Sequence, residues 1–266
     1  PAYDSPSLPI TRKHYEYCSG TNDYITVEPG YKQAVLDLYK TNHDEAVKMW
    51  GEEPFELRNV LDRWVRSPQV IDNEEFHFIP TDTLYLTVNK EAVRKSGMMI
   101  PEGMEIPERM VISLAGKHAL YKNDLMMLEM LANHNWTRPL YVATTVGAEN
   151  FMNLGDNFVQ EGLAYRITPF YTADAAGNYD SINLKNFDTE RTYNNVVKRF
   201  KFGGLSAKGL YIDETVMRMC YTHRRMLSTL AERLLAKGDK KKALTIADLC
   251  EKEIPVYNVP RSFQDQ

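Results

Sequence analysis

A short polar segment follows a predicted strand in the middle of the chain. Its polar residues are Thr144, Thr145, Glu149 and Asn150. They come directly after the apolar run 139–143, and in open α/β sheets ligands bind beyond the carboxyl ends of strands, where helix N-termini offer free N–H groups to anions. We take them, with Arg166 from the predicted strand 163–167, as candidate ligand-binding residues. The single Gly147 is far short of a dinucleotide or phosphate-loop signature, so a purely structural turn is the alternative interpretation.

Acidic side chains offer a second kind of chemistry, because glycoside hydrolysis uses two carboxylates at a working separation. The candidates are Asp156, Glu161, Asp188 and Glu190. Asp188 precedes a predicted helix and is better explained as its N-cap. Glu161 is better explained as an ion-pair partner of Arg166 or Arg138. The catalytic residues are therefore left unassigned.

Metal and covalent chemistry find little support in the sequence. The six histidines are dispersed and form neither H-x-x-x-H nor H-E-x-x-H: His14, His43, His77, His118, His134 and His223. The cysteines Cys18, Cys220 and Cys250 lack C-x-x-C and zinc-finger spacing, and a Cys220–Cys250 disulfide between neighbouring helices stays open as an alternative to thiols. We expect no metal site and no cofactor.

Composition excludes some classes of protein. The 266 residues are 43% hydrophobic, enough to bury a substantial core. A net charge of -4 argues against a general nucleic-acid binder, which carries a basic surplus. No apolar stretch reaches the roughly 20 residues that span a bilayer, and the N-terminus does not resemble a signal peptide. Sixteen tyrosines and three tryptophans could line a glycan groove, but aromatic residues more often pack in the core.

The hydrophobic periodicity predicts a mixed architecture. Helices are expected at 31–50, with a break near Thr41-Asn42, at 54–65 and at 122–133. Strands are expected at 24–27, 76–79, 84–88, 110–114, 139–143 and 163–167, with a loop at 97–103. Helix 122–133 is expected to be buried, capped by Asn123 or Asp124, with Glu129 on a narrow polar side. The order helix, strand, loop and helix around 139–143, a buried-strand run, indicates a parallel α/β layer.

The C-terminal third is predicted to be helical after a surface loop at 172–186. Asp188 caps one helix and Asp213 caps a long one, which turns at Gly238-Asp239 into a last helix at 240–253. The pattern L-A-E-x-L-L-x-x-G-D-x-x-x-A-L is similar to the antiparallel hairpin of tetratricopeptide arrays. We predict an α/β (or α+β) fold, a mixed sheet flanked by helices, over residues 1–205. A tetratricopeptide-like helical hairpin follows over residues 206–266.

Five phrases, in order, resemble one family of large bacterial membrane proteins of unknown function. They are L-Y-K-N-D-L-M at 120–126, N-W-T-R-P-L-Y at 135–141, V-Q-E-G-L-A-Y-R at 159–166, F-G-G-L at 202–205 and D-E-T-V-M-R-M at 213–219. The N-terminal, multi-spanning half of that family is similar to protein O-mannosyltransferases. The resemblance implies that this chain is the periplasmic, C-terminal part of such a protein. It also implies an acidic Gly-Asp-Asn-Asp-type loop further upstream, so the first domain is expected to be incomplete at its N-terminus.

Three hypotheses for function follow. The leading one is an accessory domain of a membrane-bound glycosyltransferase-like protein, which binds acceptor protein, glycan or a partner and reaches the membrane through the absent half. The second is an enzyme with a site near 144–150 that missing upstream residues complete. The third is a structural scaffold built on the helical hairpin.

Overall fold

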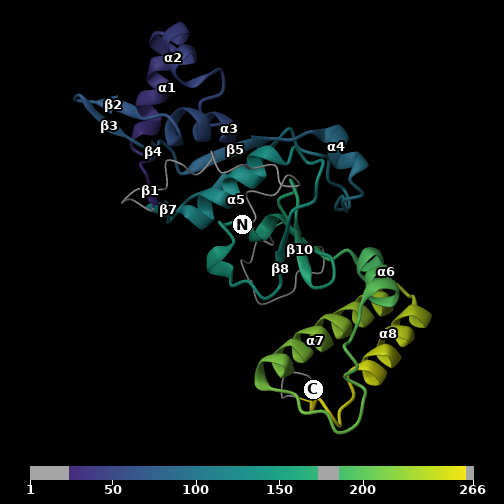
Figure 1. Ribbon diagram of the computed structural model, residues 1–266. Coiled ribbons are helices and arrows are strands. Elements are labelled where there is room, and N and C mark those ends of the chain that lie inside the picture. Colours follow the sequence, from purple (N-terminus) through teal and green to yellow (C-terminus); the bar gives the residue numbers. More distant parts are fainter. Residues whose placement is uncertain (1–23, 173–185, 262–266) are drawn as a thin grey trace. The chain divides into compact units, whose positions relative to one another are not determined.

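The computed structural model describes residues 24–172 and 186–261. Helices and short sheets alternate along the chain, which confirms the mixed α/β class (Figure 1). His14, Cys18 and most of the predicted loop at 172–186 lie outside the described residues. Across the described ranges, no helix is both long and apolar enough to cross a membrane.

The chain divides into two compact units, and each is built from several stretches of sequence. Unit 1 contains Pro1–Leu140, Thr145–Phe158 and Ile167–Ala173. Unit 2 contains Tyr141–Thr144, Val159–Arg166 and Asp174–Gln266. Unit 2 takes in strand residues from before residue 205 as well as the C-terminal helices, and the predicted domain boundary after residue 205 stays a prediction.

Unit 1 begins with helices that match their predicted positions. Helix α1 (Tyr31–Thr41) and helix α2 (His43–Trp50) are separated at Asn42, whose φ of -148° and ψ of 74° are not helical. Helix α3 (Leu57–Val60) continues into the π-helical turn η3 (Leu61–Val65).

Aromatic side chains fill part of the core of unit 1. The rings of Trp50 and Trp64 stack 5.1 Å apart, and Phe78 meets Trp64 edge-on at 5.2 Å. All three side chains are buried. Offset and edge-on pairs are the arrangements that aromatic rings prefer. These rings therefore stabilise the core and do not form a glycan-stacking surface.

The sheets of unit 1 are small. Strand β1 (Tyr24–Val27) pairs in parallel with β4 (Phe78–Ile79) and antiparallel with β7 (Ala119–Tyr121), which makes a mixed sheet. Strands β5 (Thr83–Thr87) and β6 (Arg109–Ser113) form an antiparallel pair. Their buried side chains alternate with more exposed ones, as a period of two requires.

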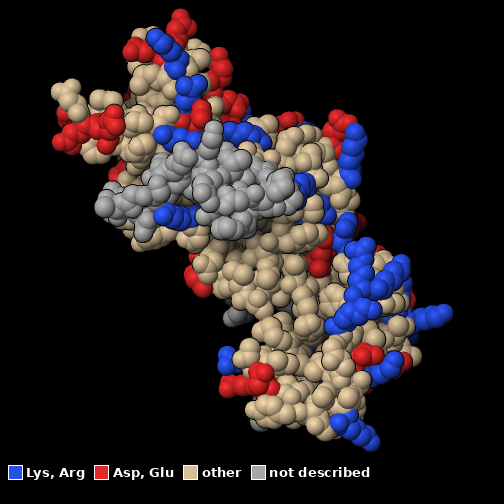
Figure 2. All heavy atoms as spheres, in the orientation of Figure 1, with Lys and Arg blue, Asp and Glu red and all other residues tan. Residues whose placement is uncertain are grey.

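Besides strand β7, a hairpin and a short helix of unit 1 were not predicted. Strands β2 (Gln69–Ile71) and β3 (Glu74–Phe76) form a hairpin, and α4 (Lys90–Lys95) is a short helix before the predicted loop at 97–103. The hairpin turns at Asp72 and Asn73, which have φ of 52° and 66°. Figure 2 shows acidic side chains gathered over this hairpin.

Helix α5 (Lys122–Asn133) has the predicted bounds but a different cap and a different polar residue. Tyr121 is the N-cap, and Asp124 completes a capping box by accepting the backbone N–H of Tyr121 at 3.1 Å. The prediction that Glu129 marks a polar side is wrong, because Glu129 is fully buried beside Leu125 and Leu128. An ion pair with Arg66 compensates its charge.

The described part of unit 2 combines a small sheet with three helices. The sheet has the order β8 (Tyr141–Ala143), β10 (Ala164–Ile167) and β9 (Phe158–Gln160). Strand β8 pairs antiparallel with β10. The prediction of a buried strand in a parallel layer at 139–143 is therefore wrong. Tyr141 and Ala143 are exposed and Val142 is half-buried, so the apolar run reflects one covered face of an edge strand.

The helices of unit 2 are α6 (Thr189–Arg199), α7 (Glu214–Ala236) and α8 (Lys240–Glu253), close to their predicted ranges. As predicted, Asp188 caps α6 by accepting the N–H of Arg191, and Asp213 caps α7. Gly238, at φ 81°, makes the left-handed turn that allows α8 to run back along α7. The pair confirms the C-terminal hairpin, while its tetratricopeptide likeness stays a prediction.

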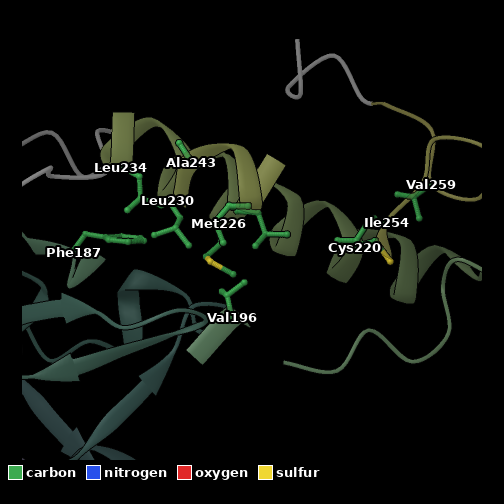
Figure 3. Close-up of a cluster of buried hydrophobic side chains, with 11 residues drawn as sticks. Phe187, Val196, Cys220, Met226, Leu230, Leu234, Ala243, Ile254 and Val259 are labelled. Carbon is green, nitrogen blue, oxygen red and sulfur yellow. The ribbon is translucent and has the colours of Figure 1, made fainter. Parts of the chain in front are cut away.

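One hydrophobic cluster holds the helices of unit 2 together. Side chains of α6, α7 and α8 contribute to it (Figure 3), and two of its members, Leu230 and Ile246, have no exposed surface. Leu235 on α7 and Leu244 on α8 are 53% and 62% exposed. The two cysteines of the described part, Cys220 and Cys250, are thiols, so the disulfide between them is not formed.

Removal of the α7 cap provides a local test of this fold. The Asp213 carboxylate accepts the N–H groups of Thr215 at 2.8 Å and Val216 at 3.0 Å. Asp213→Ala is expected to lower the free energy of unfolding by about 1 kcal/mol, because these donors lose their acceptor. Urea denaturation measures the loss. Asp248→Ala, which removes an exposed carboxylate within α8, serves as the control and is expected to change stability by less than about 0.5 kcal/mol.

Candidate functional site

The predicted strand-end segment is divided between the two units, with Thr144 in unit 2 and residues 145–150 in unit 1. Thr144 extends the β8–β10 pairing: its N–H and its hydroxyl both donate to the Leu163 carbonyl, at 3.2 Å and 3.3 Å. Because the strands run antiparallel, the rule that places ligands at the carboxyl ends of parallel strands does not apply here. The role of Thr144 in this geometry is to end the strand pair in unit 2.

The other residues of the segment belong to unit 1 and lie on its surface. Thr145, Glu149 and Asn150 are exposed, and the predicted helix is a single 3-10 turn, η4 (Ala148–Asn150). Asn150 donates to the Glu149 carboxylate at 3.0 Å. A Cβ at Gly147 would lie 2.2 Å from that carboxylate, so the Glu149 side chain folds back over the glycine. A three-residue turn offers little of the aligned N–H array that binds anions at helix ends.

Arg166 belongs to a buried polar cluster of unit 2. It is 2% exposed, and its Nη1 lies 3.4 Å from Oε1 of Glu161, whose side chain is also 2% exposed. This contact confirms the expectation that Glu161 pairs with Arg166. The same oxygen lies 3.3 Å from Nε of Arg191 on α6. The second oxygen, Oε2, accepts the Tyr141 hydroxyl at 2.6 Å.

The backbone around Glu161 explains how the cluster is positioned. Glu161 and Gly162 form the turn from β9 to β10, and Gly162 has φ of 81°. Its N–H donates to the hydroxyl of Thr192 on α6 at 3.0 Å. A side chain at this position would be strained and would meet the Phe200 ring at 3.3 Å. The glycine therefore brings the turn against α6, where Arg191 reaches the carboxylate.

In this cluster the buried Glu161 carboxylate is held by its donors and does not present a reactive group. Burial, followed by the hydrogen bond to Glu161, raises the pKa of Tyr141 to about 12, so its hydroxyl stays protonated at neutral pH. Both oxygens of Glu161 are engaged by donors, which leaves no exposed carboxylate for acid–base chemistry. The further acidic candidates have local roles: Asp188 caps α6, and Glu190 pairs with Lys242 at 3.1 Å.

A second buried polar cluster lies in unit 1 and was not predicted. Glu129 is fully buried, and burial raises its pKa even though Arg66 and Asn133 donate to it. His134 at the end of α5 is 3% exposed, and burial lowers its pKa to about 4. Its Nδ1 lies 2.7 Å from the Leu131 carbonyl, so the neutral ring donates from that nitrogen. No sequence pattern links Glu129 to Arg66, which lies 63 positions earlier.

Within residues 24–172 and 186–261, no three His, Cys, Asp or Glu side chains come together in a way that could hold a metal ion. The five histidines of this part are dispersed: His43 lies in α2 and His223 in α7, whereas His77, His118 and His134 lie outside the helices and strands.

Comparison with known families provides the context for this geometry. The family described as TMEM260-associated domain 2 matches residues 1–190, more than two thirds of the chain. This chain belongs to that family. The matched range of TMEM260-associated domain 2 covers the described part of unit 1 and the Glu161–Arg166 pair, and it ends at the start of α6.

Membership of TMEM260-associated domain 2 is consistent with a domain of a TMEM260-like membrane protein. The family match supports the expected resemblance to a membrane protein. It does not show a likeness to O-mannosyltransferases. Searches of curated proteins and of solved structures returned no match.

Proposed function

We propose that this chain is an accessory domain of a membrane-bound glycosyltransferase-like protein, which binds acceptor protein, glycan or a partner on the periplasmic side of the bacterial inner membrane. Family membership supports the membrane-protein context. The glycosyltransferase, the periplasmic side and the choice of ligand come from the resemblance of the five sequence phrases and belong to the proposal.

The observation that carries the accessory role is the full engagement of Glu161. It is the most buried of the four carboxylates considered for catalysis, and both of its oxygens already accept from Tyr141, Arg166 or Arg191. A general acid or base must exchange a proton with a substrate, which such a carboxylate is not placed to do. We infer that the buried charge of unit 2 maintains the structure, and that ligands meet the domain at its surface.

A structural scaffold is the second candidate. Leu235 on α7 and Leu244 on α8 are more than half exposed, on helices that otherwise bury their leucines against each other. In tetratricopeptide-like arrays, such outer faces are covered by the next repeat. The enzyme hypothesis gains less support, because Thr145, Glu149 and Asn150 are exposed.

A thermal-shift panel tests the binding role. The panel contains monosaccharides, oligosaccharides, sugar phosphates and unfolded peptides. A ligand at about 100 times its dissociation constant stabilises the folded state by about 2.7 kcal/mol and is expected to raise the midpoint by several degrees Celsius. A flat response to every class would contradict the binding role and favour the scaffold.

The same panel locates the contact once a ligand is found. Glu149→Ala is expected to reduce the shift if the exposed segment 145–150 takes part. Glu102→Ala, which removes another exposed carboxylate of unit 1, is the matched control. An equal loss in both variants would point to general charge effects and exclude a role of the segment.

A further inference from the structure

Charge is distributed unevenly along the chain. Residues 186–261 contain 15 Lys and Arg against 9 Asp and Glu, whereas residues 24–172 contain 14 against 21. A chain with a net charge of -4 therefore includes a C-terminal part with a surplus of six positive charges. Such asymmetry is typical of a domain with one surface directed toward an anionic partner.

The positive charge is concentrated in one acid-free stretch, which we call the basic segment (residues 191–212). It runs from α6 through the loop to the start of α7 and contains five basic residues and no Asp or Glu. Arg191 is engaged by Glu161 and Asp188. The other four, Lys198, Arg199, Lys201 and Lys208, are exposed. None of these four forms an ion pair with a carboxylate of the described residues. Lys and Arg side chains gather over α6 in Figure 2.

The basic segment also contains large apolar side chains that are exposed to solvent. Tyr211 is 92% exposed, Leu210 is 43% exposed and Val197 on α6 is 45% exposed. Tyr211 and Leu210 lie at the end of a loop that changes direction at three glycines, Gly203, Gly204 and Gly209. An added Cβ at any of these glycines would meet no atom within 4 Å. The loop is thus open to a partner on the side of its glycines.

We propose that the basic segment is a membrane-surface contact, in which Lys198, Lys201 and Lys208 bind anionic phospholipid headgroups and Tyr211 inserts at the interface. Basic residues near an anionic bilayer bind it electrostatically, and tyrosine favours the headgroup level because one end is apolar and the other polar. This proposal goes beyond the accessory role and is independent of which protein or glycan the domain binds.

Two observations favour a lipid surface over other anionic partners. Membership of a family consistent with a TMEM260-like membrane protein brings a bilayer within reach. Exposed Lys208 lies within three positions of exposed Leu210 and Tyr211 in the sequence, and basic and apolar side chains together suit a bilayer surface, which has charged headgroups outside and acyl chains within. The alternative partner is a second copy of the chain, whose acidic residues 24–172 would contact the basic segment. The experiment below distinguishes the two.

Vesicle flotation with the full 266-residue chain tests the contact. We expect binding to vesicles that mix phosphatidylcholine with phosphatidylglycerol, and none to phosphatidylcholine alone. The combined variant Lys198→Gln, Lys201→Gln and Lys208→Gln is expected to bind about a hundred-fold more weakly, since each basic residue near an anionic surface changes affinity about five-fold. Tyr211→Ser is expected to weaken binding about five-fold through the loss of apolar burial.

The matched control removes the same charge from the surface of unit 1. Lys40→Gln, Lys48→Gln and Lys95→Gln together change three exposed lysines on α1, α2 and α4. This variant is expected to retain most of the vesicle affinity. Equal losses in the two triple variants, or equal binding to neutral vesicles, would overturn the proposal. Concentration-dependent self-association that vanishes in the basic-segment variant, without vesicle binding, would assign the surface to a second copy and also overturn it.

The chain can fail to bind vesicles and still respond in the thermal-shift panel, and it can bind vesicles without responding in the panel. The two experiments therefore test the membrane contact and the binding role independently. All the substituted side chains are exposed, and unchanged circular dichroism of the variants confirms that folding is intact.

Discussion

Replacement of Glu161 with alanine is expected to lower the free energy of unfolding of unit 2 by about 3–5 kcal/mol. The change removes a buried carboxylate whose Oε1 lies 3.4 Å from Nη1 of Arg166, a side chain that is itself 2% exposed. It also removes the acceptor of the Tyr141 hydroxyl and one partner of Arg191. Urea denaturation, followed by hydrogen exchange in strand β10 and helix α6, measures the loss and assigns it to unit 2.

Two further variants separate buried charge from general effects. Glu161→Gln keeps an acceptor but loses the charge, and it is expected to cost less than alanine. Glu190→Ala breaks the ion pair with Lys242. Because the Glu190 side chain is 59% exposed, this variant is expected to lower the free energy of unfolding by less than about 1 kcal/mol. Similar losses for Glu161→Ala and Glu190→Ala would show that the Glu161 cluster is not a buried structural charge network.

His134 is expected to make the stability of unit 1 depend on pH. Its pKa is lowered from 6.5 to about 4 in the folded protein, because burial disfavours the charged ring. The unfolded state therefore takes up a proton at a higher pH than the folded state does. The stability contributed by His134 is complete above pH 6.5 and is lost as the pH falls toward 4, by up to about 3 kcal/mol in total.

His134→Gln isolates this effect. We expect the difference in unfolding free energy between variant and wild type to change with pH between 6.5 and 4, and to be constant above pH 7. Glu129 acts in the opposite direction: its raised pKa means that the folded state takes up that proton first, so falling pH favours folding there. Glu129 is present in both proteins, so its contribution largely cancels in the comparison. A pH-independent difference would contradict the buried, neutral assignment of His134.

Much of the fold was predictable where the signal is local. The break between α1 and α2, the bounds of α5 and the α7–α8 pair follow from helical periodicity, from caps such as Asp213 and from the Gly238-Asp239 turn. These features depend on residues a few positions apart, which hydrophobic spacing and capping describe well.

The features that were not predicted depend on contacts between residues that are far apart in the sequence. Strands β7 and β9 have three residues each and form only because partners elsewhere in the chain pair with them. Glu129 looked like the polar side of α5 because the sequence around it does not reveal Arg66. In the candidate site, the Glu161–Arg166 pair spans five positions and was expected. Tyr141 lies 20 positions from Glu161 and Arg191 lies 30, and neither contact was predicted.

The interleaving of the two units has a consequence for how the chain is made. Residues 141–144 and 159–166 belong to unit 2, while 145–158 and 167–173 return to unit 1. During synthesis, strands β8 and β10 emerge before α6, so Glu161 and Arg166 are made before Arg191 is available to them. At about 5–20 residues per second the ribosome adds the 30 residues between Glu161 and Arg191 in a few seconds. Unit 1 is likewise incomplete until residue 173 has been added, so no single truncation point separates two intact units.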